Sequence, residues 1–397
     1  MNRPLLWTSV SAFLLAGITA CILSACTSSN VRPEGEQLAR ITNSAQWVGT
    51  RFENEQPLWW DMRSAFLRVF ESTVDEVPKQ PVPIVSDGGK GFATPSKSGL
   101  RVTWFGHSSV FLEIDGTTVL TDPFWGERTS PVSWAGPKRW YAPPVALNEL
   151  PKIDVVVISH DHYDHLDRST IVAMTKWDAT FVAPLNVGAY LVRWGVPESR
   201  IRELDWWESI RIGTIEIVAT PARHASGRAR PQTDQTLWAG YAFIGPKHRA
   251  WYSGDTGFHS SLERIGTRLG PFDVTLIESG QYDADWADWH LGPEQAVEAH
   301  RLVQGKRMIP VHWGLLKLAH HSWTEPIERV LVAARCTSVD VLTPRPGESI
   351  EPTDPPPLQR WWPQTTWRSA SEKPIVATKY GQTAQRVEIP RCNTTAG

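Results

Sequence analysis

Residues 159–167, SHDHYDHLD, crowd metal-binding side chains into a short segment directly after the apolar run IDVVVI. Imidazole and carboxylate are groups that bind zinc in proteins, at about 2.0 to 2.2 Å. Several of them at the end of one predicted strand would repel one another and lack solvation unless a cation held them. The segment therefore predicts a metal site. Its four candidate ligands are His160, His162, Asp164 and His165.

Three later apolar runs also end in a residue of metal-ligand type. ATPARHASG places His224 after the run TIEIVATP, and WYSGDTG places Asp255 after HRAWYS. IPVHWG places His312 at the end of RMIPV. Each occurrence alone is a weak signal. Together they predict a single site that several strand ends assemble at one rim of the fold.

The elements that must position these residues begin near Leu100, where short apolar runs replace a polar, proline-rich stretch. Asp115-Gly116 between two alternating runs predicts a β-hairpin. Further along, helix-like stretches at 168–177, 293–304 and 325–336 alternate with apolar runs. This order predicts an α/β architecture of mixed sheets covered by helices.

Composition narrows the classes of partner. The chain has 397 residues, with 40 Lys and Arg against 42 Asp and Glu, a net charge of −2. Without a long basic block to neutralise phosphates, nucleic acid is excluded as an expected partner. The 21 tryptophans are expected mainly in buried packing, and a pocket lining or a lipid interface are the alternatives.

The N-terminus has the pattern of a targeting segment. Arg3 precedes the apolar stretch 4–22, and Leu23-Ser24-Ala25-Cys26 resembles the lipobox of bacterial lipoproteins. That resemblance implies a signal peptide at 1–25, lipidation of Cys26, and a protein of the bacterial cell envelope. Thr27 after the cysteine implies the outer membrane, facing the periplasm. An uncleaved membrane anchor is the alternative.

The remaining chain divides into three predicted parts. Residues 26–98 form a tether and N-terminal extension, 99–350 the domain that contains the candidate metal ligands, and 351–397 a tail packed on it. Besides Cys21 of the signal peptide and the lipidated Cys26, the cysteines are Cys336 and Cys392. In an oxidising compartment they form either a disulfide or two free thiols.

The motifs together resemble a known family. HDHYDHLD, with His224, SGDTG and PVHWG, is similar to the metallo-β-lactamase superfamily of metal-dependent hydrolases from about Thr103 to Arg329. Within it, GHSSVFLEIDGTTVLTDPFW, GPKRW and HLGPEQAVEAH resemble the N-acylphosphatidylethanolamine-hydrolysing phospholipase D branch. The resemblance implies a four-layer αββα sandwich and two divalent metal ions. The donor set favours zinc, with iron or manganese as alternatives.

The resemblance also assigns the ligands. His160, His162 and His224 would hold the first metal. Asp164, His165 and His312 would hold the second, with Asp255 bridging the two.

Such a pair of metals can share a hydroxide, because coordination lowers the pKa of water from 15.7 to about 7. Asp164 is expected to orient this nucleophile, and His290 to contact the substrate or give a proton to the leaving group. A structural role at a helix start is the alternative for His290. His107 and Asp122 are expected to brace the ligands. The other candidate histidines, expected at the surface or without an assigned role, are His259, His320 and His321.

These expectations favour a phosphodiesterase of phospholipase D type that cleaves N-acylphosphatidylethanolamine-like lipids. The resemblance to the phospholipase branch also implies a homodimer. A lactonase or a hydrolase of small phosphoesters is the alternative within the same fold. A non-catalytic envelope lipoprotein would not need an array for two metals, because a structural zinc site closes with four ligands. A β-lactamase proper is disfavoured, since the fold alone does not determine the substrate.

Overall fold

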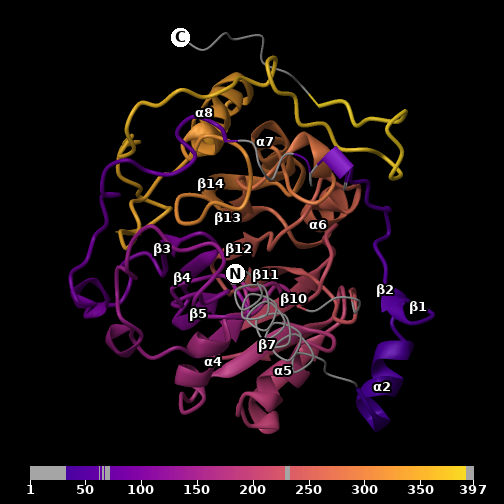
Figure 1. Cartoon of the computed structure of the whole chain (residues 1–397). Coiled ribbons are helices and arrows are strands. Elements are labelled where there is room, and N and C mark those ends of the chain that lie inside the picture. Colours follow the sequence, from indigo (N-terminus) through magenta and orange to yellow (C-terminus); the bar gives the residue numbers. More distant parts are fainter. Residues whose placement is uncertain (1–32, 62, 65–66, 68–71, 229–232, 390–397) are drawn as a thin grey trace, which may run out of the picture.

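The computed structural model describes residues 33–61, 63–64, 67, 72–228 and 233–389. The predicted signal peptide and Cys26 lie outside these residues. Two seven-stranded mixed sheets stack face to face and helices cover both outer faces (Figure 1). This arrangement confirms the predicted α/β fold class, the αββα sandwich.

The first sheet has the strand order β16-β3-β4-β5-β6-β7-β8. Its strands β3 to β5 pair antiparallel, and β5 to β8 run parallel. Its strands are β3 (Leu100–Gly106), β4 (Ser109–Ile114), β5 (Thr117–Thr121), β6 (Val155–Val157), β7 (Thr180–Pro184), β8 (Ile201–Leu204) and β16 (Ser349–Ile350).

The second sheet has the order β15-β14-β13-β12-β11-β10-β9, antiparallel from β9 to β12 and parallel from β12 to β15. Its strands are β9 (Ser209–Ile212), β10 (Ile215–Thr220), β11 (Gly240–Ile244), β12 (Arg249–Tyr252), β13 (Phe272–Glu278), β14 (Gly305–Val311) and β15 (Asp340–Val341). A separate hairpin of the N-terminal extension pairs β1 (Trp47–Val48) with β2 (Arg51–Phe52).

Helices cover each sheet from outside. The first sheet packs against α4 (Arg168–Met174) and α5 (Gly188–Arg193). The second sheet packs against α6 (Ser261–Leu269), α7 (Pro293–Leu302) and α8 (Glu325–Thr337). The helix α2 (Gly35–Thr42) belongs to the extension. Short 3₁₀ helices occur at Lys90–Phe92, Leu147–Glu149, Glu198–Arg200 and Ala284–Trp286.

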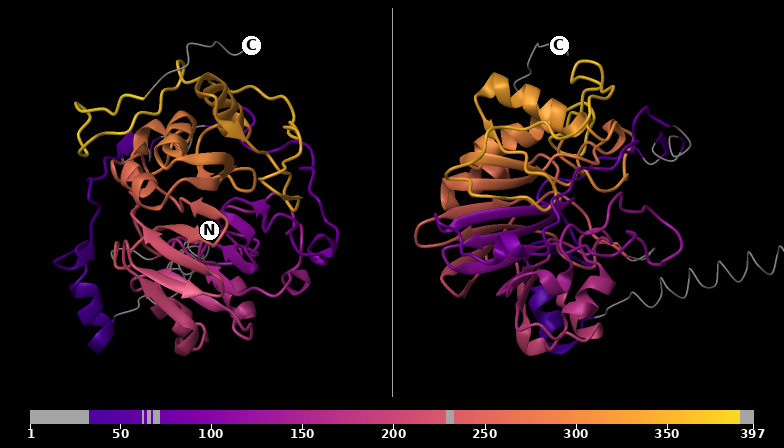
Figure 2. Two further views of the ribbon diagram at one scale, coloured as in Figure 1. Left: turned by 180° about the vertical axis from the view of Figure 1, so that it is seen from behind. Right: turned by 90° about the vertical axis from the view of Figure 1, so that its left-hand side faces the viewer.

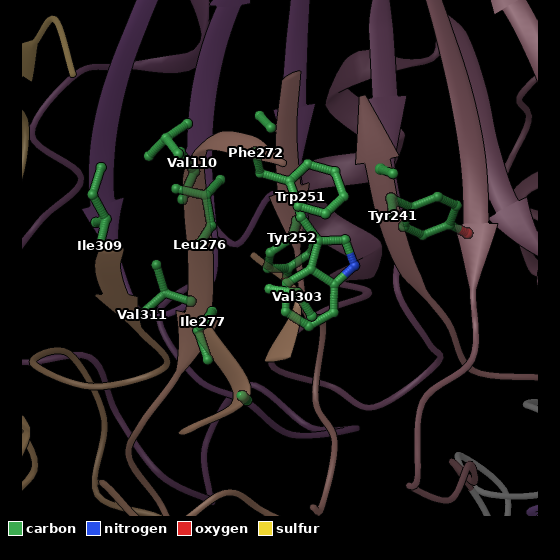
Figure 3. Packing of buried hydrophobic residues seen from close by; sticks show 14 of the residues in the cluster. Val110, Tyr241, Trp251, Tyr252, Phe272, Leu276, Ile277, Val303, Ile309 and Val311 are labelled. Atoms are coloured by element: carbon green, nitrogen blue, oxygen red, sulfur yellow. The ribbon is translucent and has the colours of Figure 1, made fainter. Parts of the chain in front are cut away.

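Apolar side chains from the strands fill the space between the sheets. Figure 3 shows Val110 of the first sheet beside Leu276, Trp251 and Tyr252 of the second, all fully or almost fully buried. Burial of this kind contributes about 25 cal/mol per Å² of apolar surface and holds the two sheets together. The predicted hairpin is present between β4 and β5. Its turn residues Asp115 and Gly116 both have positive φ, as a two-residue turn that matches the strand twist requires.

The described parts of the N-terminal extension and of the segment after β16 lie over the outside of the sandwich (Figure 2). The segment after β16 crosses above α8, and the extension runs down one side to α2. Cys336 of α8 is disulfide-bonded, and the other three cysteines fall outside the described positions. Among the helices that can be described, none has the length and apolar character needed to cross a bilayer.

One residue of the extension is bonded directly to the backbone of a predicted metal ligand. The Asn54 side chain donates from Nδ2 to the His224 carbonyl at 2.7 Å and accepts from the His224 N–H at 3.0 Å. Its Oδ1 also accepts from Trp238 Nε1 at 3.0 Å. These contacts set the backbone position of His224 from outside the two sheets.

Replacing Asn54 is therefore expected to loosen the His224 loop. Asn54→Ala removes three hydrogen bonds and leaves a buried N–H unpaired, so the free energy of unfolding should fall by about 1–3 kcal/mol. Urea unfolding measures this change, and a zinc titration should show weaker binding at the same time.

Asn148→Ala is the matched control, because Asn148 is exposed and far from the loop in sequence. Its unfolding free energy should stay within about 0.5 kcal/mol of the wild type. If Asn54→Ala left both stability and zinc affinity at the wild-type level, the hydrogen bonds between Asn54 and the His224 backbone would have no structural role.

Candidate metal centre

The first predicted donor set comes together at one end of the sandwich. His160 and His162 follow β6, and His224 follows β10. His160 Nε2 lies 2.8 Å from His162 Nδ1, and His224 Nε2 lies 3.2 Å from the same atom. His160 and His224 are fully buried, and burial together with the neighbouring imidazoles holds the pKa of His160 well below its ordinary value. Neutral imidazoles with converging nitrogens are the form in which histidine binds a metal.

The second predicted set also converges. Asp164 Oδ2 lies 3.2 Å from His165 Nε2 and 3.5 Å from His312 Nε2. The Nε2 atoms of both histidines are buried and make no hydrogen bond. Because a buried polar atom without a partner costs free energy, these orphaned nitrogens fit a cation that they would bind.

Asp255 lies between the two sets, as a bridging ligand must. Its Oδ2 is 3.1 Å from His165 Nε2 and 3.3 Å from His312 Nε2. The same oxygen is 3.8 Å from the Nε2 atoms of His160 and His224. The Oδ1 atom of Asp255 is buried without a hydrogen bond. All seven predicted ligands thus meet in one cluster, and the donor set fits two divalent cations.

Outer partners hold the ligand rings in place. Asp122 Oδ2 lies 2.7 Å from His165 Nδ1, and Asp122 Oδ1 accepts from the Ser159 N–H. The Trp289 carbonyl lies 2.9 Å from His224 Nδ1. Histidines that bind metals are oriented in this way, with the second ring nitrogen bonded to a carboxylate or carbonyl. The contacts agree with the predicted bracing role of Asp122.

His107 contacts a predicted ligand directly. Its Nε2 lies 2.7 Å from Asp164 Oδ2, which orients that carboxylate, and the ring belongs to the same group of potential ligands as His312. The two backbones are also joined, since the His312 N–H donates to the His107 carbonyl at 2.8 Å. The stacked rings of Trp104 and Trp313 reinforce this link between β3 and β14.

Three residues in the loops around the site have strained backbone conformations. His107, Asp122 and His312 have φ values of 52°, 35° and 65°, a left-handed region that non-glycine residues rarely adopt. Such conformations cost about 1–3 kcal/mol each and persist where surrounding bonds enforce them. The strain therefore accompanies the precise placement of these side chains.

His290 lies at the edge of the cluster. Its ring is stacked against His312 with centroids 5.1 Å apart, and its Nδ1 is 3.9 Å from Asp255 Oδ2. The side chain is 15% exposed, whereas the predicted histidine ligands His165 and His312 are 0% and 1% exposed. This position suits a group that meets a substrate beside the two donor sets.

Glu278 is the functional residue that the sequence reasoning missed. It ends β13, is fully buried, and its Oε2 lies 2.7 Å from His290 Nδ1. The available signal was the same as for the other ligands, an acidic residue at the end of the apolar run FDVTLI.

The remaining candidate histidines lie elsewhere. His321 Nε2 accepts from the Gln281 N–H, and its ring stacks on Tyr282. His320 lies 3.4 Å from Glu76, and His259 is buried beside Arg223. Within the part of the chain that the structure describes, none of the three belongs to a group of potential metal ligands.

Without metal, the two histidines of the second predicted set, His165 and His312, are protonated. Burial works against a charged His312, but Asp255, Asp164 and Glu278 outweigh it and raise the pKa to about 10. For His165, likewise buried, the carboxylates of Asp255 and Asp164 raise the pKa well above its ordinary value. Both groups therefore carry a proton at pH 7 that a cation has to displace.

Metal binding should accordingly release protons, up to one from each of these two histidines, and the affinity should rise between pH 6 and pH 8. Calorimetric titration with zinc at pH 7, in two buffers of different ionisation enthalpy, counts the protons. His312→Ala should release about one proton fewer. If the heat of binding were the same in both buffers, no protons would be released, and His165 and His312 would not be protonated in the metal-free protein.

Comparisons with known proteins agree with this geometry. A model of the β-lactamase superfamily domain matches residues 117–313. An uncharacterized protein of Mycobacterium tuberculosis is 49% identical over 289 residues, which is 72% of this chain and 77% of the relative. The N-acyl-phosphatidylethanolamine-hydrolyzing phospholipase D 1 of Caenorhabditis elegans is 39% identical over 231 residues, 55% of this chain and 65% of that protein.

The fold is also found among solved structures. A possible metal-dependent hydrolase from Veillonella parvula matches with a TM-score of 0.51 and 19% identity, over 63% of this chain and 98% of that one. At this identity the likeness concerns the fold alone. With the family model, the relatives and the converging ligands taken together, the chain belongs to the metallo-β-lactamase superfamily and is a metal-dependent hydrolase of that family.

Proposed function

We propose that this hydrolase is a phosphodiesterase of phospholipase D type, which cleaves N-acylphosphatidylethanolamine-like lipids between the phosphate and the head-group alcohol. The observation that carries the proposal is the pair of adjacent donor sets that share Asp255, with His290 beside them. The printed activity of the Caenorhabditis elegans relative supports the substrate class. The products would be a phosphatidic acid and an N-acylethanolamine.

His160, His162 and His224 would hold one cation, and Asp164, His165 and His312 the other. When bound, two such cations lower the pKa of water to about 7 and stabilise negative charge on a phosphodiester. We infer zinc as the metal, because imidazole and carboxylate are ligands that zinc takes in proteins. Iron and manganese, which such donors also suit, are the alternatives.

The side chains supply orientation and proton transfer. Asp164 Oδ2 is held by His107 at 2.7 Å, so the carboxylate presents a fixed acceptor to the attacking water. His290 lies beside both donor sets. Its imidazole would take the proton that the attacking water loses and give it to the departing alkoxide. General acid catalysis of this kind contributes about 10²–10⁴-fold to a rate.

A location in the cell envelope, which we also propose, would be consistent with the same substrate. The lipobox-like Leu23-Ser24-Ala25-Cys26 lies outside the described residues, and we propose that a lipidated Cys26 anchors the enzyme in the bacterial outer membrane, facing the periplasm. A lipoprotein anchor with several acyl chains holds a protein stably on a membrane. The phospholipids of that membrane would then be the nearest substrates. Assembly as a homodimer stays a prediction.

The proposal is tested with a soluble form that begins after Cys26, loaded with zinc and mixed with vesicles that contain N-acylphosphatidylethanolamine. Mass spectrometry should detect phosphatidic acid and N-acylethanolamine. Asp255→Ala removes the carboxylate shared by the two sets and should abolish both products.

Glu263→Ala is the control, because Glu263 lies on α6 outside the site, and it should cleave at the wild-type rate. A zinc-loaded wild type that leaves the lipid intact would refute the lipid substrate. Cleavage of lactones or small phosphoesters by that same sample would establish the alternative activity.

A further inference from the structure

Glu278 is a buried carboxylate that lies beside the histidines of the candidate metal centre. Its Oε2 lies 2.7 Å from His290 Nδ1 and 3.3 Å from His312 Nδ1. Its Oε1 accepts from the backbone N–H groups of Thr256 and Leu291. The side chain therefore connects the loop after Asp255, the loop before α7 and the end of β14.

The charge partners of this carboxylate are unusual. The ion pairs of Glu278 in the described chain are all with histidines, and no lysine or arginine is among them. Burying a carboxylate without a permanent cation is costly. A neutral residue of similar size could accept the same two backbone hydrogen bonds, so the negative charge itself points to a role toward the imidazoles.

The contact distinguishes the two nitrogens of His290. The Nδ1 atom is occupied by Glu278, whereas Nε2 has no hydrogen-bond partner among the residues that can be described. The ring also lies against both donor sets, with centroids 5.1 Å from His224 and 5.1 Å from His312. The free nitrogen is therefore the one available to a substrate.

We infer that Glu278 is a positioning residue for His290: it keeps one proton on Nδ1 and leaves the lone pair of Nε2 free to take the proton that the attacking water loses. The imidazolium formed in this way then gives that proton from Nε2 to the leaving-group oxygen as the bond from phosphorus to that oxygen breaks. The orientation follows from the contacts alone, and its effect on turnover rests on the proposed function. The arrangement resembles the carboxylate of a catalytic triad, which holds its imidazole in one tautomer without reacting.

A competing role for Glu278 is direct coordination. Ligand atoms of Asp255, Glu278, His290 and His312 all lie within 4.8 Å of one another. In that case His290 Nδ1 would carry a metal rather than a proton. The first role requires a proton on His290 Nδ1 and the second requires a metal on it. A measurement that shows what this nitrogen carries therefore distinguishes the two roles.

The first test is ¹⁵N NMR of the histidine rings in the zinc-loaded protein, with the His290 signals assigned from a His290→Gln sample. A proton on Nδ1 is expected in the wild type. Glu278→Gln turns an acceptor into a donor and should move the proton to Nε2 while the zinc content stays the same. A wild-type His290 protonated at Nε2, or with metal on Nδ1, would overturn the inference.

The second test is a double-mutant cycle on vesicle cleavage, with zinc content measured for every variant. Glu278→Gln should lower kcat by about 10²–10⁴-fold, because an Nε2 atom that already carries the proton cannot take one from the attacking water. KM should stay within a few-fold of the wild type. If Glu278 acts through His290, then Glu278→Gln with His290→Gln should be no slower than His290→Gln alone. If the double variant instead lost kcat by the product of the two single losses, Glu278 would act independently of His290, which would contradict this role.

Glu325→Gln is the matched control. Glu325 is equally buried and accepts from Tyr282 Oη at 3.0 Å, but it lies on α8 away from the cluster. This variant should keep the wild-type kcat and the His290 tautomer. If the wild type cleaves no lipid, the proposed function fails, and the NMR result still decides the position of the proton.

Discussion

The structure depends on how the charges of a buried cluster of imidazoles and carboxylates are balanced. Nitrogens of His165 and His312 and an oxygen of Asp255 lie without hydrogen bonds in a region that water scarcely reaches. Such groups are stable in a protein interior only when opposite charge meets them. Without metal, protons on His165 and His312 supply that charge, and two cations would supply it in the active enzyme.

The sandwich gives this cluster its rigid support. Each ligand follows the end of a strand, so packing of the two sheets places ligands from distant parts of the sequence within a few ångströms. The loops between the sheets are then locked by specific contacts. Asp122 orients His165, the stacked Trp104 and Trp313 join two strand ends, and Asn54 of the extension holds the backbone of His224. Segments outside the sheets thus contribute to the geometry of the site.

Much of this could be predicted from the sequence, because the strongest signals are local. The spacing of His160, His162 and His165 after an apolar run, and the turn at Asp115-Gly116, both depend on neighbouring residues alone. The roles of Glu278 and Asn54 were not predicted. Glu278 is one acidic residue among many, and Asn54 acts on a residue 170 positions away. Contacts of this kind depend on the path of the folded chain, which composition and periodicity do not describe.

The clustered ligands should hold two metal ions. The most direct test is an anomalous diffraction map of zinc-loaded crystals, recorded at the zinc edge. We expect two peaks about 3.5 to 4 Å apart, with Asp255 reaching both. One should lie beside His160, His162 and His224, and the other beside Asp164, His165 and His312. A single peak, or peaks that lie away from these residues, would contradict this expectation.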